Sequence, residues 1–239
     1  MPRFFIEDNY SNQPIIRGND AHHIKQVLRM KRGDLLEILT ADHKLLSCEI
    51  EQMADDSIVL KIVNIISENI NPPRTVLAQG LVKGDKMDFI IQKSVELGVT
   101  DFVPLRLTRC VAEYTGDKAI KKCERWQKIA IEAAKQSKHC VLPTVHSIQS
   151  LNEFLTNCTA QLKLVAYELE STTTLKQVLR SSDLNVDTAF IVGAEGGLES
   201  REVQQSIDKG FVAISLGKQI LRTETAPLAL LAALQYEKS

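Results

Sequence analysis

Two glycine-containing segments near the C-terminal end carry the residue types that could bind a ligand. In the first, residues 191–198, Gly193, Gly196 and Gly197 come directly after an apolar run. Glycine adopts positive φ angles and lets a backbone approach a ligand closely. The spacing differs from the Gly-x-Gly-x-x-Gly pattern of dinucleotide-binding folds, and no Lys-Ser or Lys-Thr pair follows as in phosphate-binding loops. The segment therefore indicates another kind of ligand loop, or a tight turn without a ligand.

The second segment, residues 215–226, contains the charged residues Arg222 and Glu224. It lies between an apolar run predicted to be a strand and an apolar run predicted to be a helix. Charges at such a junction are usually paired or functional, because burying an isolated charge is costly. A structural alternative is that Thr223 or Thr225 caps the following helix while Glu224 interacts with its dipole.

Composition limits the classes of protein that could hold these loops. The chain has 239 residues, 44% hydrophobic and 25% charged, with a formal net charge of −1, which is typical of a soluble globular protein. Its longest apolar run, residues 226–234, is shorter than the ~20 residues that cross a bilayer, and its first residues turn acidic before a signal-peptide core could form. We therefore expect a cytoplasmic protein without membrane contact. The five cysteines include no Cys-x-x-Cys pair, so neither disulfides nor a metal site is predicted.

The N-terminal part of the chain predicts β structure. Aliphatic runs separated by short polar turns lie at residues 34–40, 44–53 and 57–66. This pattern is typical of hairpins in a small barrel or sandwich. A short helix is predicted over residues 22–30, capped by Asn19 or Asp20 and ended by Gly33. Prolines 72 and 73 interrupt the pattern, so we place the domain boundary there, with domains at residues 1–72 and 73–239.

The C-terminal part alternates between strand and helix patterns. Strands are predicted at residues 75–81, 101–107, 162–167, 188–192 and 212–216, and helices at residues 86–97, 123–137 and 200–209. Such alternation predicts an α/β fold with a parallel sheet covered by helices on both faces. A last helix, residues 228–234 with Pro227 in its first turn, is apolar all the way around. It must be buried in the core or against another subunit, and we expect a homodimer.

Basic residues cluster in two places on this nearly neutral chain. One cluster lies along the helix pattern between Lys118 and Lys138. The other lies near the N-terminus and consists of Arg17, Lys25, Arg29, Lys31 and Arg32. Such clusters suit a phosphate-binding surface, although solvated helix faces would look the same.

Taken together, the two loops strongly resemble those of the bacterial small-subunit ribosomal RNA methyltransferase E family. The matching motifs are Gly-Ala-Glu-Gly-Gly at residues 193–197, Leu-Gly at residues 216–217 and Ile-Leu-Arg-Thr-Glu-Thr-Ala at residues 220–226. Residues 27–30, 33–34, 83–87, 91–98 and 126–130 also resemble family motifs, so the resemblance covers nearly the whole chain. Members of the family are SPOUT-class enzymes that methylate N3 of a uridine in 16S rRNA.

The resemblance implies a PUA-like RNA-binding β-barrel at residues 1–72 and a SPOUT methyltransferase domain with a C-terminal trefoil knot at residues 73–239. It also implies a homodimer that acts on 16S rRNA within the small ribosomal subunit. Lys83 and Lys86 join the N-terminal cations as expected RNA contacts. The expected S-adenosylmethionine-binding residues are Gly193, Glu195, Gly196, Gly197, Leu216, Gly217, Ile220, Leu221, Thr225 and Ala226.

Three positions depart from the family pattern. Ala194 stands where the family has proline, which should loosen the first loop without removing a polar contact. Lys135 replaces an acid and His139 replaces an arginine. We expect these two changes to alter RNA contacts or the identity of the orthologue.

The implied reaction needs a group that removes the proton from uridine N3 or stabilises the resulting uridylate. Arg222 is the candidate for stabilising negative charge on the uracil oxygens, and an ion pair with Glu195 or Glu224 is its structural alternative. Either glutamate could be the base. The target uridine is expected to flip out of any stack. A second hypothesis keeps the fold but targets tRNA or a ribose hydroxyl, and a third is a ribosome-assembly RNA-binding protein without catalysis.

Overall fold

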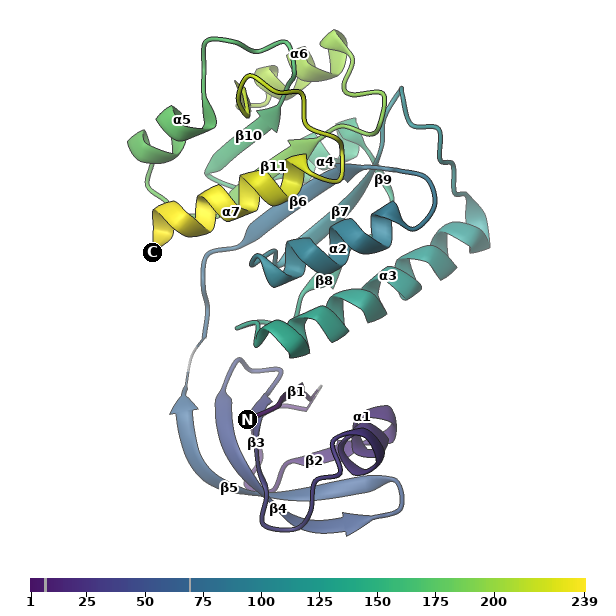
Figure 1. Cartoon of the computed structure of the whole chain (residues 1–239), viewed down its shortest axis with the longest axis vertical. Coiled ribbons are helices and arrows are strands. Elements are labelled where there is room, and N and C mark those ends of the chain that lie inside the picture. The colour runs from purple at the N-terminus through teal and green to yellow at the C-terminus, as the bar shows by residue number, and fades with distance from the viewer. Residues whose placement is uncertain (7, 69) are drawn as a thin grey trace. The chain divides into compact units, whose positions relative to one another are not determined.

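The structure, a computed structural model, describes residues 1–239 except residues 7 and 69 (Figure 1). The chain forms two compact units. The first consists of Met1–Pro72 and Lys135–Leu142, and the second of Pro73–Ala134 and Pro143–Ser239. Within the described residues, no helix is long and apolar enough to cross a membrane.

The first unit is built on a five-stranded sheet in the order β1-β3-β4-β5-β2. Its strands are β1 (Arg3–Phe5), β2 (Ile15–Arg17), β3 (Leu35–Leu39), β4 (Leu45–Ala54) and β5 (Ser57–Ser67). The predicted hairpins are confirmed, because β3, β4 and β5 pair antiparallel in sequence order. Alternate residues of these strands, including Leu36, Ile38 and Leu46, are fully buried in one core. The short strands β1 and β2 were not predicted, because three residues carry no detectable period.

The predicted N-terminal helix differs in place and form. An α-helix, α1, spans Gly18–His22, and a π-helical turn, η1, follows it over His23–Val27. Neither Asn19 nor Asp20 is the cap, since Arg17 holds that position without a side-chain hydrogen bond. Asp20 instead pairs with Lys135, with Oδ1 and Nζ 2.5 Å apart. The cap prediction was wrong because a long-range partner takes the carboxylate.

The second unit contains a seven-stranded sheet in which every pairing is parallel. The order is β12-β10-β11-β6-β7-β8, with β9 also pairing with β7. Every residue of β6 and β11 is buried, as expected for central strands covered on both faces. The strands are β6 (Thr75–Gly80), β7 (Asp101–Arg106), β8 (Thr144–Val145), β9 (Gln149–Ser150), β10 (Leu162–Ala166), β11 (Thr188–Val192) and β12 (Val212–Ile214).

Helices cover both faces of this sheet, which confirms the predicted α/β class. The helices are α2 (Lys86–Glu96), α3 (Gly116–Ser137), α4 (Leu151–Asn157), α5 (Leu175–Ser181), α6 (Ser200–Asp208) and α7 (Ala226–Lys238). On one face, Phe154 of α4 and Val203 of α6 share a core with Val76, Leu105 and Ile191 of the strands. Helices α2 and α7 contact each other and lie over the other face, toward the viewer in Figure 1.

The start of one predicted helix needs correction, and the last helix is only partly buried within one chain. Helix α3 begins at Gly116, seven residues before the predicted start, because its first turns are charged and exposed and show no apolar stripe. The last helix, α7, is not buried on every side of this chain. Leu230, Leu231 and Leu234 are buried, but Ala232 is exposed and Tyr236 is 75% exposed.

Candidate functional site

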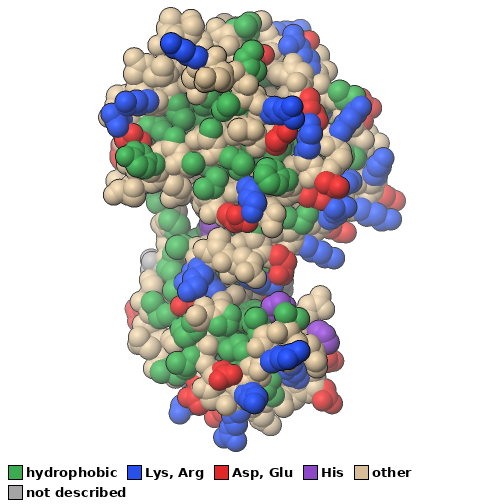
Figure 2. Space-filling model, viewed as in Figure 1, with side chains coloured by type: hydrophobic (Ala, Val, Ile, Leu, Met, Phe, Trp, Pro, Cys, Tyr) green, Lys and Arg blue, Asp and Glu red, His purple; other side chains and the backbone are tan. Residues whose placement is uncertain are grey.

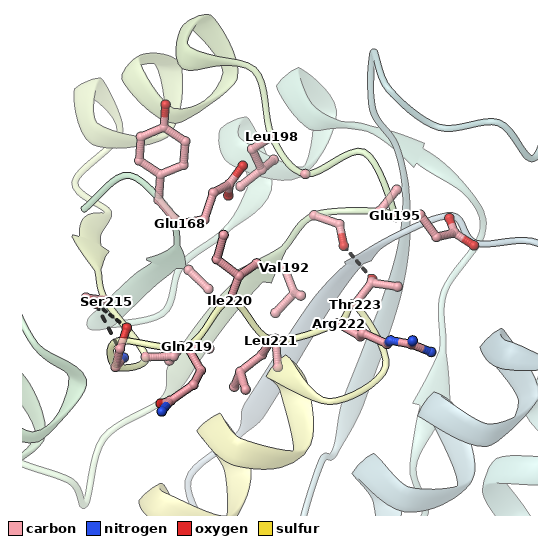
Figure 3. Close-up of a pocket in the computed structure, with 18 of the residues that line it drawn as sticks. Glu168, Val192, Glu195, Leu198, Ser215, Gln219, Ile220, Leu221, Arg222 and Thr223 are labelled. Atoms are coloured by element: carbon pink, nitrogen blue, oxygen red, sulfur yellow. Dashed lines mark hydrogen bonds between the residues drawn. The ribbon is translucent and has the colours of Figure 1, made fainter. Parts of the chain in front are cut away.

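A cavity of about 420 Å³ lies at the carboxyl ends of three neighbouring strands of the second unit (Figure 3). Its walls are the segments that follow β10, β11 and β12. Ligands of open α/β sheets bind at this edge, because the loops there can diverge around a ligand. The cavity is lined by residues 166–168, 192–198 and 215–223 together with Ala226.

Both glycine-containing segments predicted from the sequence meet in this cavity. One residue predicted to bind the cofactor, Thr225, does not line the cavity and is instead the N-cap of α7. The predicted residues that do line it are Gly193, Glu195, Gly196, Gly197, Leu216, Gly217, Ile220, Leu221 and Ala226.

A buried hydrogen-bond cluster joins the two segments. The Thr223 hydroxyl donates to the Gly193 carbonyl at 2.7 Å (Figure 3). The Gln79 amide, fully buried on β6, donates to the same carbonyl at 3.1 Å and to the Thr223 hydroxyl at 3.0 Å. Thr225 occupies the N-cap position of α7, as the capping alternative expected, but no side-chain hydrogen bond of Thr225 caps the helix. Thr223 instead fixes the distance between the two loops.

Two features of the structure require a glycine at position 197: the backbone conformation there and the closeness of a neighbouring side chain. Gly197 has a φ of +71°, and a Cβ there would lie 2.6 Å from Oε1 of Glu168. Glu168 follows β10 and lines the cavity. This carboxylate was not predicted from the sequence. Its place just after a predicted strand was a usable signal, because the carboxyl ends of parallel strands meet at one edge of the sheet.

Charged groups gather beside the cavity around Lys86 of α2. Its ammonium lies 3.5 Å from Oε1 of Glu195 and 3.9 Å from Oε2 of Glu224. The backbone N–H of Lys83 donates to the same Glu195 oxygen at 3.2 Å. Lys86 was predicted as an RNA contact, and the structure places it between the two candidate catalytic glutamates.

Arg222 is exposed, and it forms no ion pair with the residues that the structure describes. Its side chain extends toward the same side of the cavity as Glu195 (Figure 3). The alternative in which Arg222 is the ion-pair partner of Glu195 or Glu224 is wrong, because Lys86 occupies that role. The guanidinium is therefore available to a ligand.

The predicted N-terminal RNA contacts belong to the first unit. Arg17, Arg29, Lys31 and Arg32 are exposed, whereas the Lys25 ammonium donates to the carbonyls of Ala54 and Asp55. Arg29 has a φ of +52°, which follows from the irregular end of the helical segment. The sequence departures at 135 and 139 also lie in this unit, where Lys135 pairs with Asp20 and the His139 ring accepts from the Val141 N–H at 3.2 Å.

No group of three or more histidine, cysteine or acidic side chains able to hold a metal occurs among the residues described.

The sequence matches the family model of an RNA methyltransferase domain over residues 69–235 and that of an RNA methyltransferase PUA domain over residues 16–63. A Ribosomal RNA small subunit methyltransferase E from Bacillus subtilis is 36% identical, with 99% of this chain and 97% of that protein covered. The crystal structure of one from Neisseria gonorrhoeae bound to S-adenosyl methionine is 33% identical over 99% of this chain and 97% of that one, with a TM-score of 0.85. A putative methyltransferase from Legionella pneumophila, solved with the cofactor SAM, is 30% identical with a TM-score of 0.83, covering 98% of this chain and 96% of that one. Sequence and fold agree over nearly the whole length, and the chain belongs to the ribosomal RNA small subunit methyltransferase E family.

Proposed function

We propose that this chain transfers the methyl group of S-adenosylmethionine to N3 of a specific uridine in 16S rRNA of the small ribosomal subunit. One observation carries the proposal. The cavity at the ends of β10, β11 and β12 is enclosed by both glycine segments, and its rim holds Arg222 and Glu195. The relatives solved with this cofactor support the same ligand.

The residues that line the cavity fit the cofactor. S-adenosylmethionine supplies an electrophilic methyl group, so the protein's tasks are to hold it in line with the acceptor and to prepare the acceptor. We assign the adenosine to Leu216, Gly217, Ile220 and Leu221. The backbone of residues 193–197 forms the opposite wall, where side chains would take up the room that a ligand needs.

Arg222 and Glu224 are proposed to prepare the acceptor. Neutral uridine N3 carries a proton and is a poor nucleophile. Arg222 would stabilise the negative charge that develops on the uracil oxygens. Oε2 of Glu224 is buried and has no hydrogen-bond partner among the described residues, whereas Glu195 accepts from Lys83 and Lys86. These contacts favour Glu224 over Glu195 as the proton acceptor, because Oε2 of Glu224 accepts no hydrogen bond from the described residues and the Lys86 ammonium lies 3.9 Å away from it.

We further propose that residues 1–72 form a PUA-like barrel that binds RNA and that residues 73–239 form a SPOUT domain with a trefoil knot. The contact between Thr223 and Gly193 supports the knot, because it holds the chain after β12 against the loop after β11. The exposed side of α7 supports a homodimer, which we expect to act in the cytoplasm.

The experiment uses radiolabelled S-adenosylmethionine, small ribosomal subunits from cells that lack this protein, and nucleoside mass spectrometry. The expected product is 3-methyluridine in 16S rRNA. Label on tRNA or on a ribose hydroxyl would replace the proposed target, and a chain that binds no cofactor would be an RNA-binding protein without catalysis.

Arg222→Ala tests the assigned catalytic role. We expect kcat to fall by about 10²–10³-fold, the loss typical of removing one group that stabilises charge in the transition state. Cofactor affinity, measured by calorimetry, should change little. Arg201→Ala, which removes an exposed arginine from α6, is the matched control. Full methyl transfer by Arg222→Ala would contradict the role.

A further inference from the structure

A second cavity of the second unit, about 720 Å³ in volume, runs along α3 from Gly116 to Ile131. Its other walls are the chain before α3 and the segment between β8 and β9. None of its residues lines the cavity at the ends of β10, β11 and β12. Four lining residues of α3, Ile120, Cys123, Gln127 and Ile131, recur at the spacing of one helix face. We call this cavity the α3 groove.

The floor of the α3 groove is apolar. Ile120 is 59% exposed, and Val145 and Ile148 lie opposite α3 across the groove. The ring of Tyr114 lines one end and packs edge-on against Trp126, with the ring centroids 5.9 Å apart. An apolar surface of this kind that stays open to solvent indicates a contact with another molecule.

The rim of the α3 groove is predominantly basic. Of the charged lining residues, Arg106 and Lys128 are basic and Glu124 is acidic, and two further lysines of α3 lie beside the lining residue Tyr114. The ammonium groups of Lys118 and Lys122 lie 5.7 and 5.5 Å from the centroid of the Tyr114 ring. Figure 2 shows Lys and Arg side chains gathered over this part of α3, with acidic side chains among them.

An apolar and aromatic floor beneath a basic rim matches the chemistry of single-stranded nucleic acid. Bases stack on or lie against apolar side chains, while phosphates meet lysine and arginine. Paired RNA does not suit the floor, because its bases are stacked inside the helix. The Thr115 and Ser147 side chains are exposed at the groove and offer hydroxyl groups to base edges.

We propose that the α3 groove binds an unpaired stretch of the RNA substrate, away from the target uridine, with bases on its floor and phosphates on its rim. This inference rests on the proposed function, because it takes RNA as the substrate. It adds a site that reads unpaired bases to the phosphate contacts expected from the charge of α3.

Ile120→Ser tests the floor of the groove. The probes are an unstructured RNA of about 20 nucleotides and an abasic ribose-phosphate oligomer of the same length, because base contacts add to a charge-driven affinity that both oligomers share. We expect Ile120→Ser to weaken RNA binding about tenfold and to leave binding of the abasic oligomer unchanged. Ile207→Ser, at an exposed isoleucine of α6, should bind both oligomers as the unaltered chain does.

Cys123 provides a direct report from inside the groove. Burial raises the pKa of its thiol, so alkylation by N-ethylmaleimide is followed at pH 8.5 and located by peptide mass spectrometry. We expect RNA to slow alkylation of Cys123 at least several-fold. Cys158, which lines a different cavity, should react at the same rate with and without RNA.

The proposal would be overturned if Ile120→Ser weakened binding of both oligomers equally. It would also be overturned if RNA did not slow the alkylation of Cys123. Protection that rises with protein concentration in the absence of RNA would assign the groove to a second copy of the chain. Protection by an acidic peptide but not by RNA would assign it to a protein partner. Each variant is also assayed for cofactor binding. If the tests overturn the role of the α3 groove while the cofactor still binds and 3-methyluridine is formed, the proposed function stands.

Discussion

At the scale of single residues, two carboxylates of the described chain line the cavity at the ends of β10, β11 and β12, and they differ in their partners. Glu195 accepts from Lys83 and Lys86. Glu168 makes no such bond and lies against Gly197. The proposed cofactor brings ribose hydroxyls and positive charge into this space, and both interact favourably with a carboxylate.

We expect Glu168→Gln to raise the KM for S-adenosylmethionine about tenfold, because a charge-assisted hydrogen bond contributes about 1.5–3 kcal/mol. kcat should change less than threefold, since Glu168 stands apart from Arg222 and Glu224, the groups proposed to act on the uridine. Steady-state kinetics at saturating RNA separate the two constants. Asp208→Asn, an equal charge change at the exposed end of α6, should alter neither. An unchanged KM in Glu168→Gln would show that this carboxylate does not contact the cofactor.

At the scale of elements, a polar cluster joins three neighbouring strands at the edge of the sheet opposite the cavity. Asp101, at the start of β7, accepts from the Arg74 guanidinium at 2.7 Å, from His146 at 2.8 Å and from the Thr100 hydroxyl at 2.8 Å. Burial alone would raise the pKa of Asp101, but these hydrogen bonds and the Arg74 charge outweigh it and hold the pKa well below its ordinary value.

The pKa shift of Asp101 predicts a pH-dependent contribution to stability. Because the folded-state pKa lies below the unfolded one, the contribution is complete above the ordinary pKa of about 4 and is lost as the pH falls through that value toward the folded pKa. Asp101→Asn should lower the free energy of unfolding by about 3 kcal/mol at pH 7. This difference in the free energy of unfolding between the variant and the unaltered chain should shrink below pH 4. Urea unfolding at both pH values measures this, with Asp55→Asn in an exposed turn as control. A deficit that stays constant with pH would contradict the linkage.

Elements with a clear period could be predicted and short ones could not. The pattern of residues 188–192 predicted β11 at its observed bounds. The helix predicted at residues 86–97 is α2, and Gly98, with a φ of +93°, lies just past its end. Helices α4 and α5, of seven residues each, were missed. Both begin with a capping box, Ser150 with Glu153 and Thr174 with Gln177, which was the available signal.

At the scale of the whole molecule, one side of α7 remains uncovered in a single chain. Ala232 and Tyr236 are exposed on α7, and Phe89 of α2 is 43% exposed. Figure 2 shows hydrophobic side chains gathered over α7 and α2. This exposed apolar side is the observation behind the proposed homodimer, because a second copy of the chain would bury it.

We expect Ala232→Glu to shift the protein from dimer to monomer, because a charge buried in an apolar interface without a partner is costly. Light scattering after size-exclusion chromatography measures the mass, and the dimer dissociation constant should rise at least tenfold. Gln204→Glu adds the same charge on the exposed side of α6 and should leave the mass unchanged. A monomeric unaltered protein, or a dimer that tolerates the glutamate, would argue against this face.

The sequence by itself determined the class of fold, the glycine loops and their family resemblance, because these depend on local period, on residue type and on motifs that survive in linear order. Only the tertiary structure decided which side chains share the cavity. Glu168 meets Gly197, Gln79 meets Thr223, and Lys86 rather than Arg222 pairs with the glutamates. These partners are far apart in the chain, and the parallel order of the strands brings them together. A linear pattern records what each residue can do, whereas packing decides which residue is near enough to do it.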